Sequence, residues 1–255
     1  MIVFLHIPKT GGSTFRFILE RNLGLTHCHT NHNGKERFAE RDLSFARRCF
    51  PRLRSMAGHN LVDPLGWRVP DPVYMTFLRE PVARVFSQYQ DGVVRGNNRE
   101  SFEASLRHRD NLSNLHVKLM AGSEDLDRAK RFLEKCFFVG VTEKYELSLN
   151  VLHRLDPFGL DLQFDRKVVA RDNTIKKRLE SDPKMIELAR EWNRLDLELY
   201  DFGVREVLPR LCEKAGIKPS DPLESFERPR VVSNPRHYLG RLWNRAVYRQ
   251  LCKLR

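Results

Sequence analysis

The chain opens with an apolar run that is followed at once by a proline, a lysine and two glycines. Residues 2–7 read Ile-Val-Phe-Leu-His-Ile, a run of strand length rich in β-branched and aromatic side chains. Pro8 and the pair Gly11–Gly12 end this strand. Apolar residues then recur with helical spacing as far as the stop at Gly24, at Phe15, Ile18, Leu19 and Leu23. The segment predicts a strand, a glycine loop and a helix, the unit from which parallel α/β sheets are built.

The rest of the chain repeats this alternation. Further strands are predicted at 54–58, 73–78 and 137–141. Helices are predicted near 81–94, 100–108, 111–121, 125–135, from about 143, at 183–200 and near 203–215. We therefore predict an α/β, P-loop-like three-layer fold, with a central mostly parallel sheet flanked by helices. In such a sheet, ligands bind at the carboxyl ends of the strands.

The C-terminal part differs from this pattern. Residues 218–236 contain four prolines, which indicate an extended linker. A basic amphipathic helix is predicted beyond it, with apolar residues at Leu239, Leu242, Trp243, Ala246, Val247, Leu251 and Leu254, and basic ones at Arg241, Arg245, Arg249 and Lys253. We divide the chain into a domain at 1–217 and this tail at 218–255. The helix either packs on its own domain or contacts a partner protein or an anionic membrane.

Composition narrows the choice of partner and compartment. Lys and Arg total 45 against 33 Asp and Glu, a net charge of +12 that favours anionic partners such as nucleotides, acidic glycans, nucleic acid or anionic lipid. The five cysteines form no C-x-x-C pair, so a reducing compartment is expected. Neither a signal peptide nor a long apolar run is visible, and the expected location is the cytoplasm.

The loop between the first strand and helix has the composition of an anion site. Backbone N–H groups at a helix N-terminus bind anionic oxygens, and Gly11 and Gly12 allow a close approach. Lys9 adds a mobile positive charge. Hydroxyl donors come from Thr10, Ser13 and Thr14. The lysine precedes the glycines, so this is not the Walker A motif of Mg²⁺-dependent NTPases. An ordinary strand-to-helix turn with an exposed lysine is the alternative.

A second candidate phosphate site follows the strand at 73–78. Arg79 stands at the strand end, where a guanidinium can bind phosphate through two hydrogen bonds. Ser87 comes eight residues later, about two helical turns on, so its hydroxyl can face the strand end. The alternative for Arg79 is a surface ion pair with Glu80 or Asp71.

Together these elements resemble those of a known enzyme family. Residues 4–14, Phe-Leu-His-Ile-Pro-Lys-Thr-Gly-Gly-Ser-Thr, are similar to the 5′-phosphosulfate loop of carbohydrate sulfotransferases, the family that includes heparan sulfate 2-O-sulfotransferase. Residues 77–89 are similar to the family's 3′-phosphate element, in which an arginine and a serine, here Arg79 and Ser87, hold the 3′-phosphate. The resemblance implies a sulfotransferase that uses 3′-phosphoadenosine 5′-phosphosulfate (PAPS), without a required metal.

The same resemblance extends more loosely over residues 2–203. Residues 138–143 and 194–200 look familial, and we expect them to serve the fold. The polar loop 171–174 lies where relatives carry residues near the nucleotide, which assigns Asn173 and Thr174 to the donor site. The implied acceptor is a hydroxyl of a carbohydrate or glycoconjugate.

Sulfuryl transfer needs a base for the acceptor hydroxyl and a cation near the leaving oxygen. Lys9 is the candidate cation. His59 follows a predicted strand end, a position comparable to that of the family's base histidine, although a structural histidine is the alternative. His6 is expected in the core. Glu20 and Glu80 are the other candidate bases.

Several competing interpretations remain. The histidines at 27–32 could suggest a Zn²⁺ site, but no second cluster completes a ligand set, so we expect a solvated loop that contacts the acceptor. A P-loop kinase would need a lysine after the glycines and a carboxylate where this chain has Arg79. A non-enzymatic module for nucleic acid or anionic surfaces would depend on 219–255 and not on Lys9. We expect no specific nucleic-acid partner.

Overall fold

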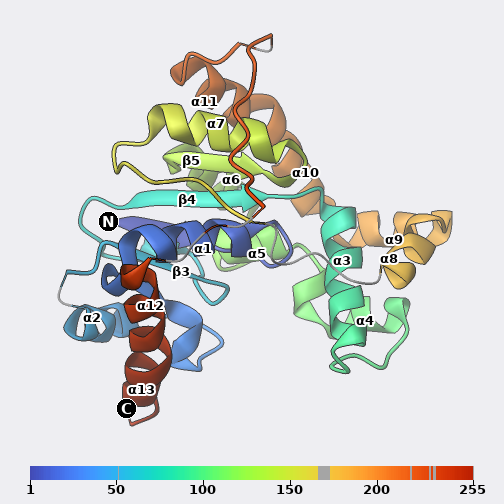
Figure 1. Cartoon of the computed structure of the whole chain (residues 1–255). Coiled ribbons are helices and arrows are strands. Elements are labelled where there is room, and N and C mark those ends of the chain that lie inside the picture. The colour runs from blue at the N-terminus through green and yellow to red at the C-terminus, as the bar shows by residue number, and fades with distance from the viewer. Residues whose placement is uncertain (51, 166–172, 219, 230, 232–233, 255) are drawn as a thin grey trace.

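The computed structural model describes residues 1–50, 52–165, 173–218, 220–229, 231 and 234–254. Its centre is an all-parallel sheet whose strands lie in the order β2-β3-β1-β4-β5 (Figure 1). The strands are β1 (Ile2–Leu5), β2 (His27–His29), β3 (Ser55–Gly58), β4 (Val73–Leu78) and β5 (Phe138–Val141). The predicted α/β class with a flanked parallel sheet is confirmed.

Helices cover both faces of this sheet, as its buried strands require. Ile2 and Phe4 pack on the face covered by α1 (Gly12–Leu23) and α7 (Tyr145–Leu155). Val3 and Leu5 point to the opposite face, which carries α5 (Leu115–Ala121), α6 (Leu126–Lys135) and α10 (Arg194–Phe202). Within the sheet Leu5 lies opposite Gly58 and Thr76, so β1, β3 and β4 end together at one edge.

A group of helices with its own apolar cluster projects beyond this carboxyl edge, on the right in Figure 1. It consists of α3 (Pro81–Val94), α4 (Phe102–His108), α8 (Thr174–Glu180) and α9 (Pro183–Trp192). The predicted start of α3 is confirmed: Pro81 occupies the first turn, and the Glu80 carboxylate accepts hydrogen bonds from the Val82 and Ala83 amides.

Three expectations from the sequence are corrected. The histidines expected in a loop belong partly to a strand, because His27–His29 pairs with β3 as the edge strand β2. The helix expected at 183–200 is broken at Asn193, whose buried side chain bonds to Leu112 and Asn114 instead of facing solvent. Helix α2 (Glu40–Cys49) and helix α8 were not predicted.

The C-terminal segment crosses the domain before its helix begins. After α11 (Leu208–Lys214) it runs past Asn150, which bonds to both backbone groups of Glu224. It ends in α12 (Pro235–Leu242), a π-helical turn (Trp243–Tyr248) and α13 (Arg249–Lys253). In Figure 1 it descends in red from α11 and continues as α12 beside α1. The division at residue 217 stays a prediction.

The C-terminal helix packs on its own domain, but through only part of the apolar face predicted for it. From that face Trp243 packs against the core, with its ring 6.5 Å from that of Phe50. Its buried residues are His237, Gly240, Asn244 and Tyr248. Leu239, Leu242, Leu251 and Leu254 are exposed. A Cβ at Gly240 would come within 2.5 Å of the Gly24 backbone, so close backbone approach selects the packed face. The part of the chain that the structure describes contains no helix long and apolar enough to cross a membrane.

Candidate functional site

The turn between β1 and α1 presents the backbone of a helix N-terminus at the carboxyl edge. Lys9 and Gly11 both adopt left-handed conformations, with φ of 69° and 75°. No side chain in the described residues caps α1, and its first turn carries no acid. The first N–H groups of the helix are therefore available to an anion, except that of Thr14, which donates to the Gly11 carbonyl at 3.1 Å.

This turn is fixed by bonds that sequence inspection missed. Thr142 Oγ1 lies 2.8 Å from the Thr10 carbonyl and 2.9 Å from that of Leu78, so it joins three segments at the sheet edge. The sequence signal for Thr142 is its position directly after β5, because residues at the carboxyl ends of parallel strands lie at the ligand-binding edge of the sheet. Thr10 was expected to present a hydroxyl donor, but this hydroxyl is buried and donates to the Ile7 carbonyl at 2.9 Å. Thr10 thus shapes the loop.

Arg79 and Lys9 meet at this edge. Arg79 Nη1 donates to the Lys9 carbonyl at 2.8 Å, while its Nε lies 4.0 Å from a Glu143 carboxylate oxygen. Lys9 Nζ lies 3.5 Å from an Asp91 oxygen on α3. Burial lowers the pKa of both cations. The Glu80 carboxylate caps α3 and is not the partner of Arg79. The side chain of Arg79 is therefore tied to residues 4–14, the segment predicted to bind the phosphosulfate and called the phosphate loop below.

The remaining predicted donor residues lie along α3 and α8. Ser87 is partly exposed on α3. One turn on, the Gln90 amide donates to Asn173 Oδ1 at 3.3 Å, which ties the start of α8 to α3. Asn173 and Thr174 are both exposed. Residues 171–172 lie outside the described residues. The fold thus brings Ser87, Asn173 and Thr174 to one group of helices beside the sheet edge.

His59 is held in one orientation and one tautomer. Its Nδ1 lies 2.7 Å from the His6 carbonyl, and its backbone N–H donates to Asn31 Oδ1 at 2.8 Å. A carbonyl only accepts, so Nδ1 carries the proton and the neutral ring keeps a lone pair on Nε2. Burial lowers the pKa of His59, and the charges of Arg16 and Lys9 act in the same direction. The ring is therefore a neutral proton acceptor near pH 7.

Beneath it lies His6, which is only 2% exposed, as expected for a core residue. The two rings lie 4.0 Å apart between centroids. A Cβ on Gly12 would fall 2.2 Å from the His6 ring. Gly12 is consequently required for close packing between the loop and the histidine that holds His59.

The two acidic candidate bases are engaged elsewhere. Glu20 forms an ion pair with Arg16 and lies 3.9 Å from His237 Nε2. Burial opposes its ionisation, yet His237 and Arg16 hold its pKa well below the usual range.

The histidine segment 27–32 was considered above as a metal site. In it, His29 Nδ1 lies 3.0 Å from His32 Nε2. No group of three or more metal-ligating side chains occurs among the described residues.

One known protein family matches most of the chain. The model described as "Sulfotransferase family" matches residues 1–203, which include strands β1 to β5, the phosphate loop and α3. The chain belongs to the sulfotransferase family. Sulfotransferases are enzymes that use a PAPS donor. No curated protein matches the chain. The C-terminal segment of this sulfotransferase lies outside the matched residues.

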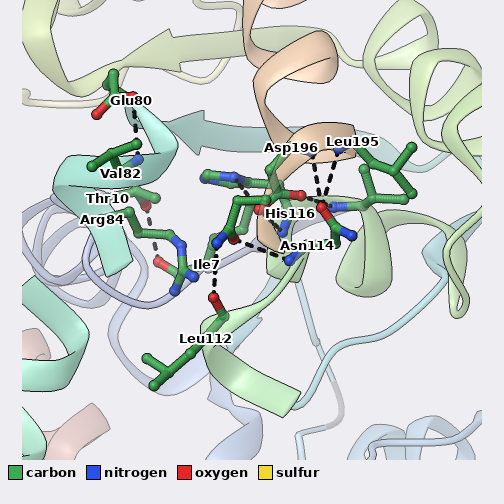
Figure 2. A network of polar contacts seen from close by, with 12 residues as sticks. Ile7, Thr10, Glu80, Val82, Arg84, Leu112, Asn114, His116, Leu195 and Asp196 are labelled. Atoms are coloured by element: carbon green, nitrogen blue, oxygen red, sulfur yellow. Dashed lines mark hydrogen bonds and ion pairs between the residues drawn. The ribbon is translucent and has the colours of Figure 1, made fainter. Parts of the chain in front are cut away.

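Two helices of this sulfotransferase, α5 and α10, cap one another (Figure 2). Asp196 accepts hydrogen bonds from the His116 and Val117 amides and from the His116 ring, at 2.9–3.0 Å. In return Asn114 Oδ1 accepts from the Leu195 and Asp196 amides. Asp196 is fully buried. The familial segment 194–200 thus joins α5 to α10, in agreement with a role in the fold.

Proposed function

We propose that this sulfotransferase moves a sulfuryl group from PAPS to a hydroxyl of a carbohydrate or glycoconjugate. The observation that carries the proposal is the meeting, at one sheet edge, of a helix N-terminus that no described side chain caps, two cations and a histidine whose neutral ring keeps a lone pair on Nε2. A kinase-like use of this edge is not favoured, because Arg79 stands where a metal-binding carboxylate would be needed.

The donor side of the site fits an elongated ligand with two separated phosphates. The first-turn amides of α1, with Lys9, would hold the phosphosulfate. Arg79 and Ser87 would hold the 3′-phosphate, and Asn173 and Thr174 would border the nucleotide. Arg79 Nε is buried without a hydrogen-bond partner among the described residues, which is the state expected of a donor reserved for a ligand.

The chemical step then depends on His59 and Lys9. PAPS supplies an activated sulfuryl group, whose bond to the 5′-phosphate oxygen breaks as the acceptor oxygen attaches to sulfur. His59 Nε2 would accept the proton that the acceptor hydroxyl loses. Lys9 would neutralise the charge that develops on the leaving phosphate. A base in this position contributes about 10²–10⁴-fold to the rate.

The net charge and the cysteines support proposals about the acceptor and the compartment of the enzyme. The net charge of +12 supports an anionic glycan as acceptor. All five cysteines are unpaired, which supports a reducing compartment.

Calorimetry with 3′-phosphoadenosine 5′-phosphate (PAP) tests the donor site. We expect wild type to bind PAP and Arg79→Ala to bind it roughly 100-fold more weakly, because two charge-assisted hydrogen bonds are lost. Arg47→Ala, an exposed arginine on α2, is the matched control and should bind like wild type. Absence of PAP binding by wild type, or full binding by Arg79→Ala, would overturn the proposal.

The base is tested separately. His59→Gln should bind PAP as wild type does, yet lose at least about 100-fold in PAP release from PAPS with an oligosaccharide panel. Unchanged turnover would reject His59 as the base while leaving the donor site intact.

A further inference from the structure

A cavity of about 310 Å³ runs along α1, next to the phosphate loop. Ser13 and Thr14, which belong to that loop, form part of its lining. The opposite wall comes from the C-terminal helix, through Gly240, Arg241, Asn244 and Arg245. The cavity therefore joins the donor side of the site to a segment that lies outside the family match.

This second wall is held firmly in place. Asn244 Nδ2 donates to the His27 carbonyl at 2.9 Å, and its Oδ1 accepts from the His29 amide at 2.8 Å. These are the free backbone groups of the edge strand β2, so the side chain replaces a neighbouring strand. The close approach of Gly240 to Gly24 fixes the helix at a second point. The lining residues of the helix consequently keep their positions relative to α1.

The cavity is lined by one more positive than negative side chain, with three arginines against two acids. Arg16, Arg241 and Arg245 line it, against the acids Glu20 and Asp165. Arg16 is already paired with Glu20. Neither Arg241 nor Arg245 has an ion pair or hydrogen bond with any residue in the described ranges. These two guanidinium groups are therefore available to an anionic ligand.

Two histidines add neutral hydrogen-bonding groups to the same lining. Burial lowers the pKa of His29 and of His32, and Arg16 acts in the same direction on both. A neutral imidazole can donate to or accept from a hydroxyl. The lining thus combines cations, which bind an anionic group, with neutral imidazoles, which bind hydroxyls. A sugar that carries an anionic group has both kinds of group.

We propose that this cavity binds the acceptor, and that the acceptor carries a carboxylate, sulfate or phosphate group held by Arg241 and Arg245. The inference rests on the proposed function, because Ser13 and Thr14 place the cavity beside the loop assigned to the donor. The C-terminal helix then selects the acceptor, whereas the family-matched part of the chain binds the donor.

Calorimetry on the PAP-saturated protein tests this assignment. The probes are methyl glucoside and three charged relatives: methyl glucuronide, glucose 6-sulfate and glucose 6-phosphate. Wild type should bind at least one charged sugar roughly tenfold more tightly than the neutral one, the strength of two partly exposed charge pairs. The charged sugar that binds most tightly identifies the anionic group.

Two double variants with the same loss of charge separate a specific effect from a general one. Arg241→Ala/Arg245→Ala should abolish the preference for charged sugars while PAP still binds. Arg249→Ala/Lys253→Ala, on the same helix but outside the cavity lining, should keep it.

The outcomes distinguish the two proposals. No preference for any charged sugar in wild type, including no measurable binding, overturns the acceptor assignment. A preference that survives in Arg241→Ala/Arg245→Ala also overturns it. Failure of PAP to bind the wild-type protein would instead refute the donor site.

Discussion

The C-terminal helix is attached to the edge strand through the side chain of Asn244. Replacing this side chain tests how the helix is held. The side chain is only 4% exposed and makes three hydrogen bonds. They join it to the His27 carbonyl at 2.9 Å, the Gly240 carbonyl at 2.9 Å and the His29 amide at 2.8 Å. Asn244→Ala would leave the backbone groups of the edge strand without these partners.

The expected loss follows from these contacts. At about 1 kcal/mol for each hydrogen bond, Asn244→Ala should lower the free energy of unfolding by about 3 kcal/mol. That is a large part of the roughly 5–15 kcal/mol typical of a domain. With an m-value of about 3 kcal/mol/M, the midpoint of urea unfolding should fall by about 1 M. Circular dichroism at increasing urea measures this midpoint.

Two variants show whether the bonds themselves are responsible. Asn97→Ala, in an exposed turn, should change stability by less than about 0.5 kcal/mol. Asn244→Asp keeps the shape and the acceptor for the His29 amide but cannot donate to His27, so it should also be destabilised. A loss below about 1 kcal/mol in Asn244→Ala, or a wild-type midpoint in Asn244→Asp, would refute this account of how the helix is held.

Three further perturbations follow from the site. Gly12→Ala places a Cβ 2.2 Å from the His6 ring, so we expect about 1–3 kcal/mol lower stability in urea and weaker PAP binding; two unchanged values would contradict the packing. Asp91→Asn frees Lys9 from its 3.5 Å ion pair, so calorimetry should show PAP binding about 2–5-fold more tightly, and weaker binding would show that Asp91 positions Lys9 instead. Burial lowers the pKa of His27 to about 4, whereas in the unfolded chain this histidine is protonated as the pH falls below about 6.5. Lowering the pH from 7 to 5 should therefore reduce the free energy of unfolding by about 2 kcal/mol through His27 alone. Equal midpoints of urea unfolding at the two pH values would contradict this.

The elements that could be predicted from the sequence are those with a strong local cause. Strand β1 is a continuous apolar run, and β4 is apolar apart from Thr76; such runs are buried wherever the sheet forms. The start of α3 follows from Pro81 and the capping carboxylate of Glu80. The phosphate loop also has a local cause, because Lys9 and Gly11 adopt left-handed backbone conformations in the turn before α1.

The elements that were missed depend on partners far away in the chain. The three residues of β2 carry two histidines, and they form a strand only because β3 lies on one side and Asn244 on the other. The break at Asn193 depends on Leu112 and Asn114, about 80 residues earlier in the chain. The same holds for the packed face of the C-terminal helix, where hydrophobic periodicity predicted Trp243 but not the buried His237 and Asn244.

The sequence by itself determined the parallel α/β class and the glycine loop between β1 and α1, because both arise from short segments whose residues act on their immediate neighbours. Only the tertiary structure decided which atoms of that loop remain available. It turned the Thr10 hydroxyl inward, joined Arg79 to the Lys9 carbonyl and fixed the tautomer of His59 through His6. It also brought the C-terminal helix alongside α1. Hydrogen-bond geometry and close backbone contact link segments distant in sequence, and no local pattern of residue types encodes them.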